Sequence, residues 1–272
     1  MTVKTFSINP EKTAYVKAFL PDVIPGIEFT EKRPSVVIFP GGGYQHCSER
    51  EQEPIAFQYL AAGYAAFVVT YSVNAPFPAS LMDAAYTFYK IRMRAEEFHI
   101  DPKKTAVLGC SSGGHLAGCL ATMWSDNLVV KSIGCEPEDL RPDAAVLCYP
   151  VISGVTSPHV GSFKVLLGDD ANRSDLSRLS LENRVTPKTP PIFLWHTAND
   201  ESVSAHNSLV MAKACISNRV PVELHMFDEG PHGISVADKM SARSENDVNP
   251  HVNGWVKLSI DFLNKYLATP HN

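Results

Sequence analysis

Short apolar runs rich in β-branched and aromatic residues alternate along this chain with longer segments of mixed polarity. Runs of this length, bounded by turn residues, are typical of buried strands. Six are predicted to be strands, at 35–40, 65–72, 104–110, 143–150, 191–197 and 222–228. The segments between them carry apolar residues at three-to-four spacing, which indicates amphipathic helices. These predicted helices lie at about 51–62, 80–98, 112–125, 203–218 and 251–267.

The regular alternation of strand and helix predicts an α/β fold with a mostly parallel central sheet and helices on both faces. No internal repeat or linker divides the 272 residues, so a single domain over 1–272 is expected. The segment 151–190 interrupts the rhythm and is rich in Ser, Asn, Asp, Arg and Pro. We interpret it as a short insertion near a functional site; a solvated excursion with no role in binding is the alternative.

The pentapeptide GCSSG at 109–113 lies at the junction of a predicted strand and a predicted helix. A GxSxG pattern in this setting is typical of a nucleophile elbow, a tight turn that exposes the serine Oγ above the sheet. Its glycines leave room where a Cβ would collide with neighbouring backbone. The sequence therefore predicts Ser111 as a nucleophile, with the N–H of Ser112, at the helix start, as an oxyanion donor. The PGGGY run at 40–44, after the first predicted strand, is expected to supply a second donor; a merely flexible glycine loop is the alternative.

The partners of such a serine follow later strands, in the order acid and then histidine. Asp200 follows the predicted strand 191–197, and His232 lies in a GPHG turn after 222–228. A histidine can take the serine proton near neutral pH while a carboxylate orients it. Asp228 is the second candidate for the acid, and Glu201 is expected to begin the next helix. Three other histidines are expected to be structural: His115, His196 and His225.

Composition and residue spacing argue against several kinds of partner and cofactor. The net charge of −5, the pI of about 6.0 and the absence of a Lys/Arg cluster argue against a nucleic-acid partner. The polar N-terminal stretch resembles neither a signal peptide nor a membrane span, which predicts a cytoplasmic protein. Six cysteines without CxxC pairs, and histidines without zinc spacing, predict no metal site. A serine nucleophile with a histidine base needs no organic cofactor, so none is expected. The sequence leaves open whether copies form a homo-oligomer.

Five segments together resemble the acetyl esterase and acetylxylan-esterase-like group of α/β-hydrolases, which is related to hormone-sensitive-lipase-type esterases. They are VVIFPGGGY, DPKKTAVLGCSSGGHLAG, RPDAAVLCYPVIS, PPIFLWHTANDESV and PVELHMFDEGPHG. The resemblance covers nearly the whole chain and implies a triad and an oxyanion hole. Carried over residue by residue, it implies Ser111, Asp200 and His232 as the triad and the main-chain N–H groups of Gly42, Gly43 and Ser112 as the hole.

Two positions depart from the lipase-type pattern: Pro40 stands where that group has the histidine of HGGG, and Ser112 where alanine is common. Neither removes a main-chain donor, and the proline fits the sugar-esterase branch. The expected function is hydrolysis of short-chain acyl esters, acetyl esters above all, of small molecules including acylated sugars, through an acyl-enzyme. The alternatives are a peptidase or thioesterase with the same triad, or a non-catalytic member that binds a ligand.

Overall fold

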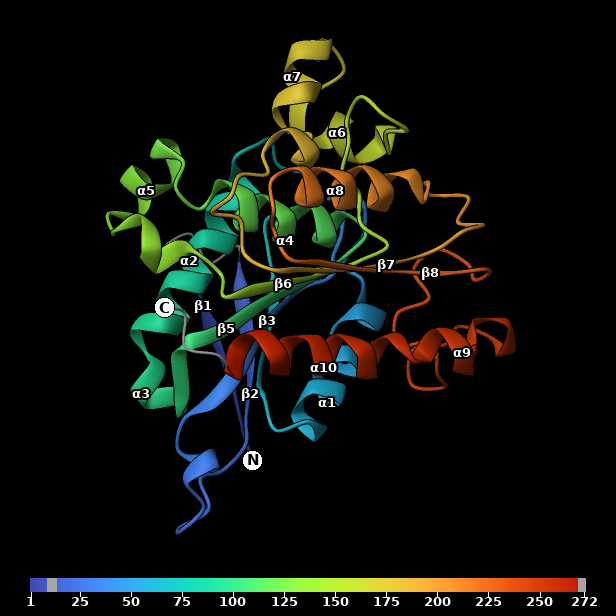
Figure 1. The fold of residues 1–272 in the computed structure, drawn as a ribbon. Helices are drawn as coiled ribbons and strands as arrows, with labels where there is room; N and C mark the ends of the chain where they lie inside the picture. The colour runs from blue at the N-terminus through green and yellow to red at the C-terminus, as the bar shows by residue number, and fades with distance from the viewer. Residues whose placement is uncertain (9–13, 269–272) are drawn as a thin grey trace.

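The computed structural model describes residues 1–8 and 14–268. Within these residues the strands form one eight-stranded sheet, in the order β1-β2-β4-β3-β5-β6-β7-β8 (Figure 1). The strands are β1 (Thr2–Ser7), β2 (Tyr15–Leu20), β3 (Arg33–Phe39), β4 (Ala65–Thr70), β5 (Ile100–Cys110), β6 (Ala144–Cys148), β7 (Ile192–Thr197) and β8 (Val222–Phe227).

The six strands predicted from the sequence, β3 to β8, pair in parallel, so the predicted class of fold is confirmed. β1 and β2 were not predicted. They form an antiparallel hairpin that joins the sheet through β2 and β4. Four of the six residues of β1 are exposed, because it lies at the sheet edge. A strand with little burial carries no apolar run for the sequence pattern to reveal.

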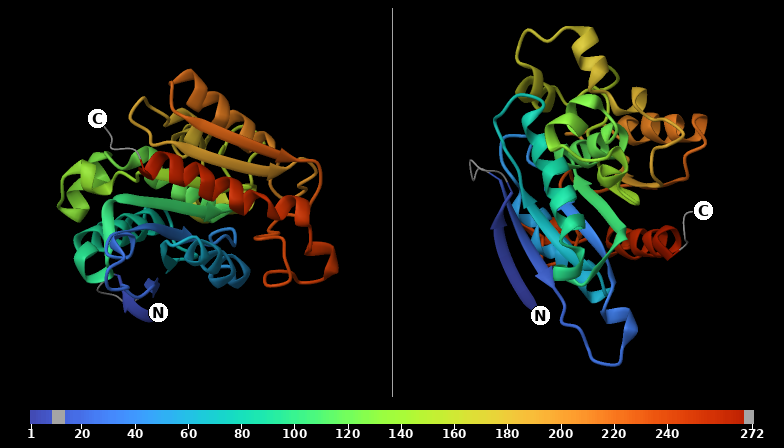
Figure 2. Two further views of the ribbon diagram at one scale, coloured as in Figure 1. Left: turned by 60° about the horizontal axis from the view of Figure 1, so that its bottom comes forward. Right: turned by 90° about the vertical axis from the view of Figure 1, so that its left-hand side faces the viewer.

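Helices cover both faces of the sheet, as predicted (Figures 1 and 2). The helices α2 (Ala79–Met93), α4 (Ser112–Met123) and α8 (His206–Ser217) pack on one face, and α1 (Glu53–Ala61) and α10 (Trp255–Ala268) on the other. Alternate residues of β3 pack on opposite faces of the sheet. Val37 and Phe39 lie in the core with α2, α4 and α8, and Val36 and Ile38 lie in the core with α1 and α10. Burial on both faces explains why these strands are continuously apolar.

Several helix boundaries differ from the prediction. The segment 80–98 is divided at Arg94, and α8 begins at His206, so Glu201 lies in a bend before the helix instead of starting it. The remaining helices are α3 (Ala95–Phe98), α5 (Asn127–Ile133), α6 (Val160–Leu167), α7 (Arg173–Arg178) and α9 (Pro250–Asn253). None of the helices in the described part of the chain has the length and apolar composition needed to span a membrane.

The segment 151–190 is folded and packed. It contains α6 and α7 and lies on the same side of the sheet as α4 and α8 (Figure 1). Phe163, Leu166 and Leu181 are buried in the core on that side. This packing argues against the alternative of a purely solvated excursion.

Candidate active site

Ser111 occupies a strained turn between β5 and α4. Its φ of 53° and ψ of −120° are rare for a residue with a side chain. A Cβ built on Gly109 would lie 2.0 Å from the carbonyl oxygen of Gly113, and one on Gly113 would lie 2.1 Å from that of Phe39. Only glycine fits at these two positions, so the close packing of strand and helix explains the GxSxG pattern.

The three residues predicted as nucleophile, base and acid come together at the ends of β5, β8 and β7. The Oγ of Ser111 lies 2.8 Å from Nε2 of His232, and Nδ1 of His232 lies 2.6 Å from Oδ2 of Asp200. Since the carboxylate can only accept, Nδ1 carries the proton and the Nε2 lone pair faces the serine hydroxyl. A base in this tautomer can remove the hydroxyl proton.

The carboxylate of Asp200 is held by several donors. Its Oδ1 accepts hydrogen bonds from the N–H groups of Ser202 and Val203, each at 2.9 Å, and its Oδ2 also lies 3.4 Å from Nε2 of His196. Burial raises the pKa of Asp200, but the hydrogen bonds from His196 and His232 lower it more, so the net pKa is well below the usual range. Asp200 is therefore ionised at neutral pH. His196, expected to be structural, contacts the carboxylate directly.

The glycine loop after β3 lies beside the serine. Gly42 and Gly43 have φ values of 126° and 65°, which favour glycine. Within the described residues, the N–H groups of Gly42, Gly43 and Ser112 donate no hydrogen bond. The N–H of the next residue, Tyr44, donates to Oγ of Ser112 at 3.3 Å, which ties the loop to the start of α4. Three unpaired donors next to the predicted nucleophile are placed where they could stabilise an anionic oxygen.

Glu51 was not recognised from the sequence. Its side chain is buried, with 3% exposure. One carboxyl oxygen accepts from the N–H of Gly41 and the other from the hydroxyl of Tyr149, both at 2.7 Å. Tyr149 in turn meets the ring of His232 edge to face, with centroids 5.2 Å apart. In the sequence Glu51 stands beside Glu49 and Arg50, so no local signal separates it from a solvated charged stretch.

The segment 151–190 contributes His159, a second residue that sequence reasoning missed. Its Nδ1 lies 2.8 Å from Oγ of Ser162, and a Cβ built on Gly43 would lie 3.9 Å from its Cε1. Burial and the nearby His232 lower the pKa of His159, while Asp200 opposes the shift. A neutral imidazole therefore lies next to the glycine loop.

In the described structure, two other residues considered as parts of the site make no side-chain hydrogen bond to Ser111: His115 is buried in the core and Asp228 is exposed. The hydroxyl of Tyr44 lies 2.8 Å from Nδ1 of His115, whose Nε2 lies 2.9 Å from the carbonyl oxygen of Leu179. Burial lowers the pKa of His115 to about 4, against the effect of the hydrogen bond to Leu179. Asp228, the second candidate for the acid, is exposed and makes no hydrogen bond to His232 within the described chain. Over residues 1–8 and 14–268, no cluster of His, Cys, Asp and Glu is arranged to hold a metal ion.

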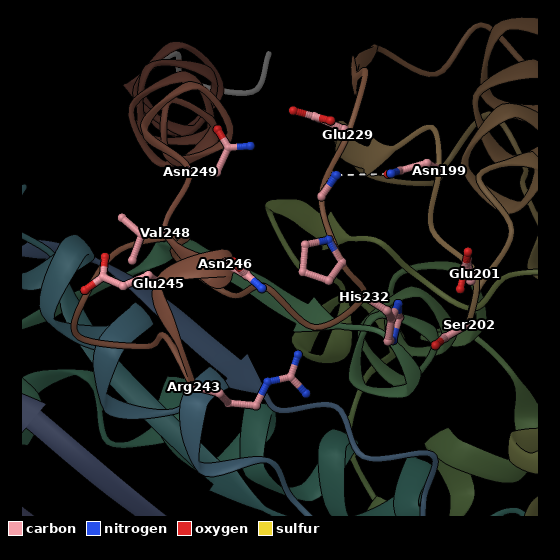
Figure 3. A pocket seen from close by; sticks show the side chains of 12 residues that line it. Asn199, Glu201, Ser202, Glu229, His232, Arg243, Glu245, Asn246, Val248 and Asn249 are labelled. Atoms are coloured by element: carbon pink, nitrogen blue, oxygen red, sulfur yellow. Dashed lines mark hydrogen bonds between the residues drawn. The ribbon is translucent and has the colours of Figure 1, made fainter.

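A pocket of about 700 Å³ opens beside His232 (Figure 3). Figure 3 shows the side chains of Arg243 and Asn246 directed toward the side on which His232 lies. The lining is mostly polar and comes from the loops after β7 and β8 and from the segment 243–249. It consists of Asn199, Glu201, Ser202, Glu229, Gly230, Pro231, His232, Arg243, Glu245, Asn246, Val248 and Asn249.

Comparison with known proteins matches residues 22–215 to the BD-FAE family. Among solved structures, the acetyl ester-xyloside bifunctional hydrolase from Caldicellulosiruptor lactoaceticus is 32% identical with a TM-score of 0.82, covering 96% of both chains. The carboxylesterase Cest-2923 from Lactobacillus plantarum WCFS1 is 26% identical with a TM-score of 0.85, covering 100% of both.

Curated relatives include Endo-1,4-beta-xylanase B of Butyrivibrio fibrisolvens, 35% identical over 76% of this chain, and the acetylxylan esterase of Xylanibacter ruminicola, 27% identical over 85%. The chain spans 33% and 46% of the length of these two relatives. Its fold and its relatives class it with the carboxylic ester hydrolases of the α/β-hydrolase fold, which confirms the resemblance noted in the sequence. The chain belongs to the BD-FAE family.

Proposed function

We propose that this protein hydrolyses short-chain acyl esters, acetyl esters above all, of small hydroxyl-rich alcohols such as sugars. Ser111 is the nucleophile, His232 the general base and Asp200 the carboxylate that orients it. One observation carries the proposal: the hydrogen-bonded line from Ser111 Oγ through the imidazole to Asp200, with distances of 2.8 Å and 2.6 Å. A nucleophile, a base and an orienting group within hydrogen-bond reach are what acyl transfer requires.

The reaction proceeds through an acyl-enzyme. His232 takes the proton of Ser111 as the Oγ attacks the ester carbonyl, and the oxyanion is stabilised by the N–H groups of Gly42, Gly43 and Ser112. The imidazolium, stabilised by ionised Asp200, then protonates the leaving alcohol. Water, deprotonated by the same imidazole, hydrolyses the acyl-enzyme and releases the acid.

The position of His232 determines where the alcohol lies. Because the imidazolium must protonate the leaving oxygen, the alcohol occupies the side of the site on which His232 lies. The pocket of about 700 Å³ borders His232 and is lined mainly by amide, carboxylate, hydroxyl and guanidinium groups. Such groups can pair with several hydroxyls, whereas an alkyl alcohol would leave them unsatisfied. Two relatives are named as an acetylxylan esterase and an acetyl ester-xyloside hydrolase, which supports the same substrate class.

The direct test measures hydrolysis of p-nitrophenyl esters from acetate to octanoate by wild type and Ser111→Ala, with folding matched by circular dichroism. We expect acetate to be turned over fastest, and the substitution to lower kcat by at least about 10³-fold. Folded wild type that cleaves no ester would contradict the proposal. Cleavage of amides or thioesters instead would move the protein to the peptidase or thioesterase class.

A further inference from the structure

The buried carboxyl group of Glu51 has no role in the mechanism described above. It is 3% exposed, and within the described chain it makes no ion pair; Arg243, which pairs with Asp247, interacts with it only through longer-range electrostatics. Burying a carboxyl group without a direct ion pair costs free energy unless its oxygens accept hydrogen bonds. Both oxygens of Glu51 do accept one, from Gly41 of the glycine loop and from Tyr149, whose ring packs on His232.

The first donor is Gly41, in the glycine loop. Oε2 of Glu51 accepts the N–H of Gly41, and the carbonyl oxygen of Gly41 accepts the N–H of Ser48 at 2.9 Å. A Cβ built on Gly41 would lie 2.7 Å from Oε2 of Glu51 and 2.9 Å from Cβ of Ser111, so Gly41 fits closely between the two side chains. Glu51 thus restrains the loop immediately before the unpaired N–H groups of Gly42 and Gly43.

The second donor is Tyr149, which directly follows β6 and contacts the loop that carries His232. Burial raises the pKa of Tyr149 well above its ordinary value, so the phenol stays protonated and donates to Oε1 of Glu51. The same hydroxyl accepts the N–H of Ser235 at 3.2 Å, three residues after His232. The tyrosine ring also packs edge to face on His232, with an interplanar angle of 71°. Glu51 therefore joins the glycine loop to the histidine loop through one tyrosine.

We propose that Glu51 is a positioning residue that holds the oxyanion donors of the glycine loop and the imidazole of His232 in place around Ser111. It acts through Gly41 and Tyr149 and does not touch the substrate. The proposal rests on the proposed esterase function. Charge develops on the oxyanion only in the transition state, so donors displaced by a few tenths of an ångström weaken transition-state binding more than substrate binding.

The decisive variant is Glu51→Gln, which preserves shape but replaces one acceptor oxygen with an amide donor. We expect kcat for p-nitrophenyl acetate to fall about 10- to 100-fold, with KM within about 3-fold of wild type. The inhibition constant of a trifluoromethyl ketone, which forms a tetrahedral adduct with the serine, is expected to rise by a similar factor. The matched control is Glu49→Gln, since Glu49 is exposed two residues away and is expected to leave these values unchanged.

A second variant, Tyr149→Phe, retains the ring against His232 but removes the link between Glu51 and Ser235. A smaller loss of kcat is expected, about 3- to 10-fold, because the bond to Gly41 remains. Wild-type kcat and ketone affinity in folded Glu51→Gln would overturn the proposal. If that variant does not fold, wild-type values in Tyr149→Phe would overturn it instead. Inactive wild type refutes the esterase function itself, which is a separate outcome.

Discussion

His196 Nε2 lies 3.4 Å from Oδ2 of Asp200, the oxygen that also bonds to His232. The ring of His196 is fixed at both nitrogens, by Oγ of Ser208 and by the carbonyl oxygen of Val203, each at 2.8 Å. Because the N–H of Val203 also donates to the other oxygen of Asp200, the carboxylate is restrained on both sides. A rigid acid of this kind can orient a general base without moving during turnover.

Asp200→Asn is expected to lower kcat for acetate esters by about 10³- to 10⁴-fold. The amide keeps the shape of the side chain but removes the negative charge and disturbs the tautomer of His232. Kinetics on folded protein measure the effect, and Asp228→Asn is the matched control because Asp228 is an exposed neighbour of the same loops. Equal losses in the two variants would argue against Asp200 as the orienting acid.

Gly113→Ala is expected to lower the free energy of unfolding by about 2 kcal/mol or more, since its Cβ would lie 2.1 Å from the carbonyl oxygen of Phe39. Gly161→Ala provides the comparison, because there the nearest atom, in His159, is 3.6 Å from the new Cβ. Because Gly161 lies inside α6, Gly161→Ala is expected to raise the free energy of unfolding by no more than about 1 kcal/mol. Urea unfolding compares the two variants. If Gly113→Ala unfolds with the wild-type free energy, the close packing at the elbow is contradicted.

His115 is expected to make stability fall at acid pH. Its folded-state pKa of about 4 lies below the ordinary 6.5, so between these values the unfolded chain binds a proton that the folded protein excludes. The contribution is absent above pH 6.5 and grows as pH falls toward 4. It amounts to about 2 kcal/mol of lost stability at pH 5 relative to pH 7.5.

Urea unfolding of wild type and His115→Gln at these two pH values tests the expectation. The variant is expected to lose less stability on acidification, by about 2 kcal/mol. His206→Gln is the control, because His206 is exposed. If His115→Gln shows the same pH dependence as wild type, another group controls acid unfolding.

Asn246→Ala is expected to lower the ratio of kcat/KM for an acetylated xyloside to that for p-nitrophenyl acetate by about 5- to 50-fold. The amide lines the pocket beside His232 and can bond to a sugar hydroxyl that the aryl ester lacks. Asn127→Ala, at an exposed position of α5, is expected to leave the ratio unchanged. An unaltered ratio in Asn246→Ala would remove this residue from the alcohol side of the site.

Local patterns in the sequence are sufficient to predict the central strands β3 to β8 and the turns that follow them. A strand buried on both faces requires a run of apolar residues, and a strained turn requires glycine. Each requirement appears within a few consecutive residues of the sequence. Ser111, Asp200 and His232 were each predicted from such a turn after a strand, and the structure brings them within hydrogen-bond distance of one another. The edge strand β1 was missed because its exposure removes the apolar signal. β2 was also missed although most of its residues are buried.

Local patterns along the chain define the class of fold, the elbow and the order in which the candidate residues follow the strands. The residues that surround them become visible only in the folded chain. Tyr149 lies 98 positions from Glu51, and His159 reaches the glycine loop from a segment without a strand pattern. The physical reason is that a side chain's partners depend on which segments meet in the fold. The residues next to Glu51 in the sequence indicate only a charged stretch. The burial of Glu51 and its two hydrogen bonds exist only after the chain has folded.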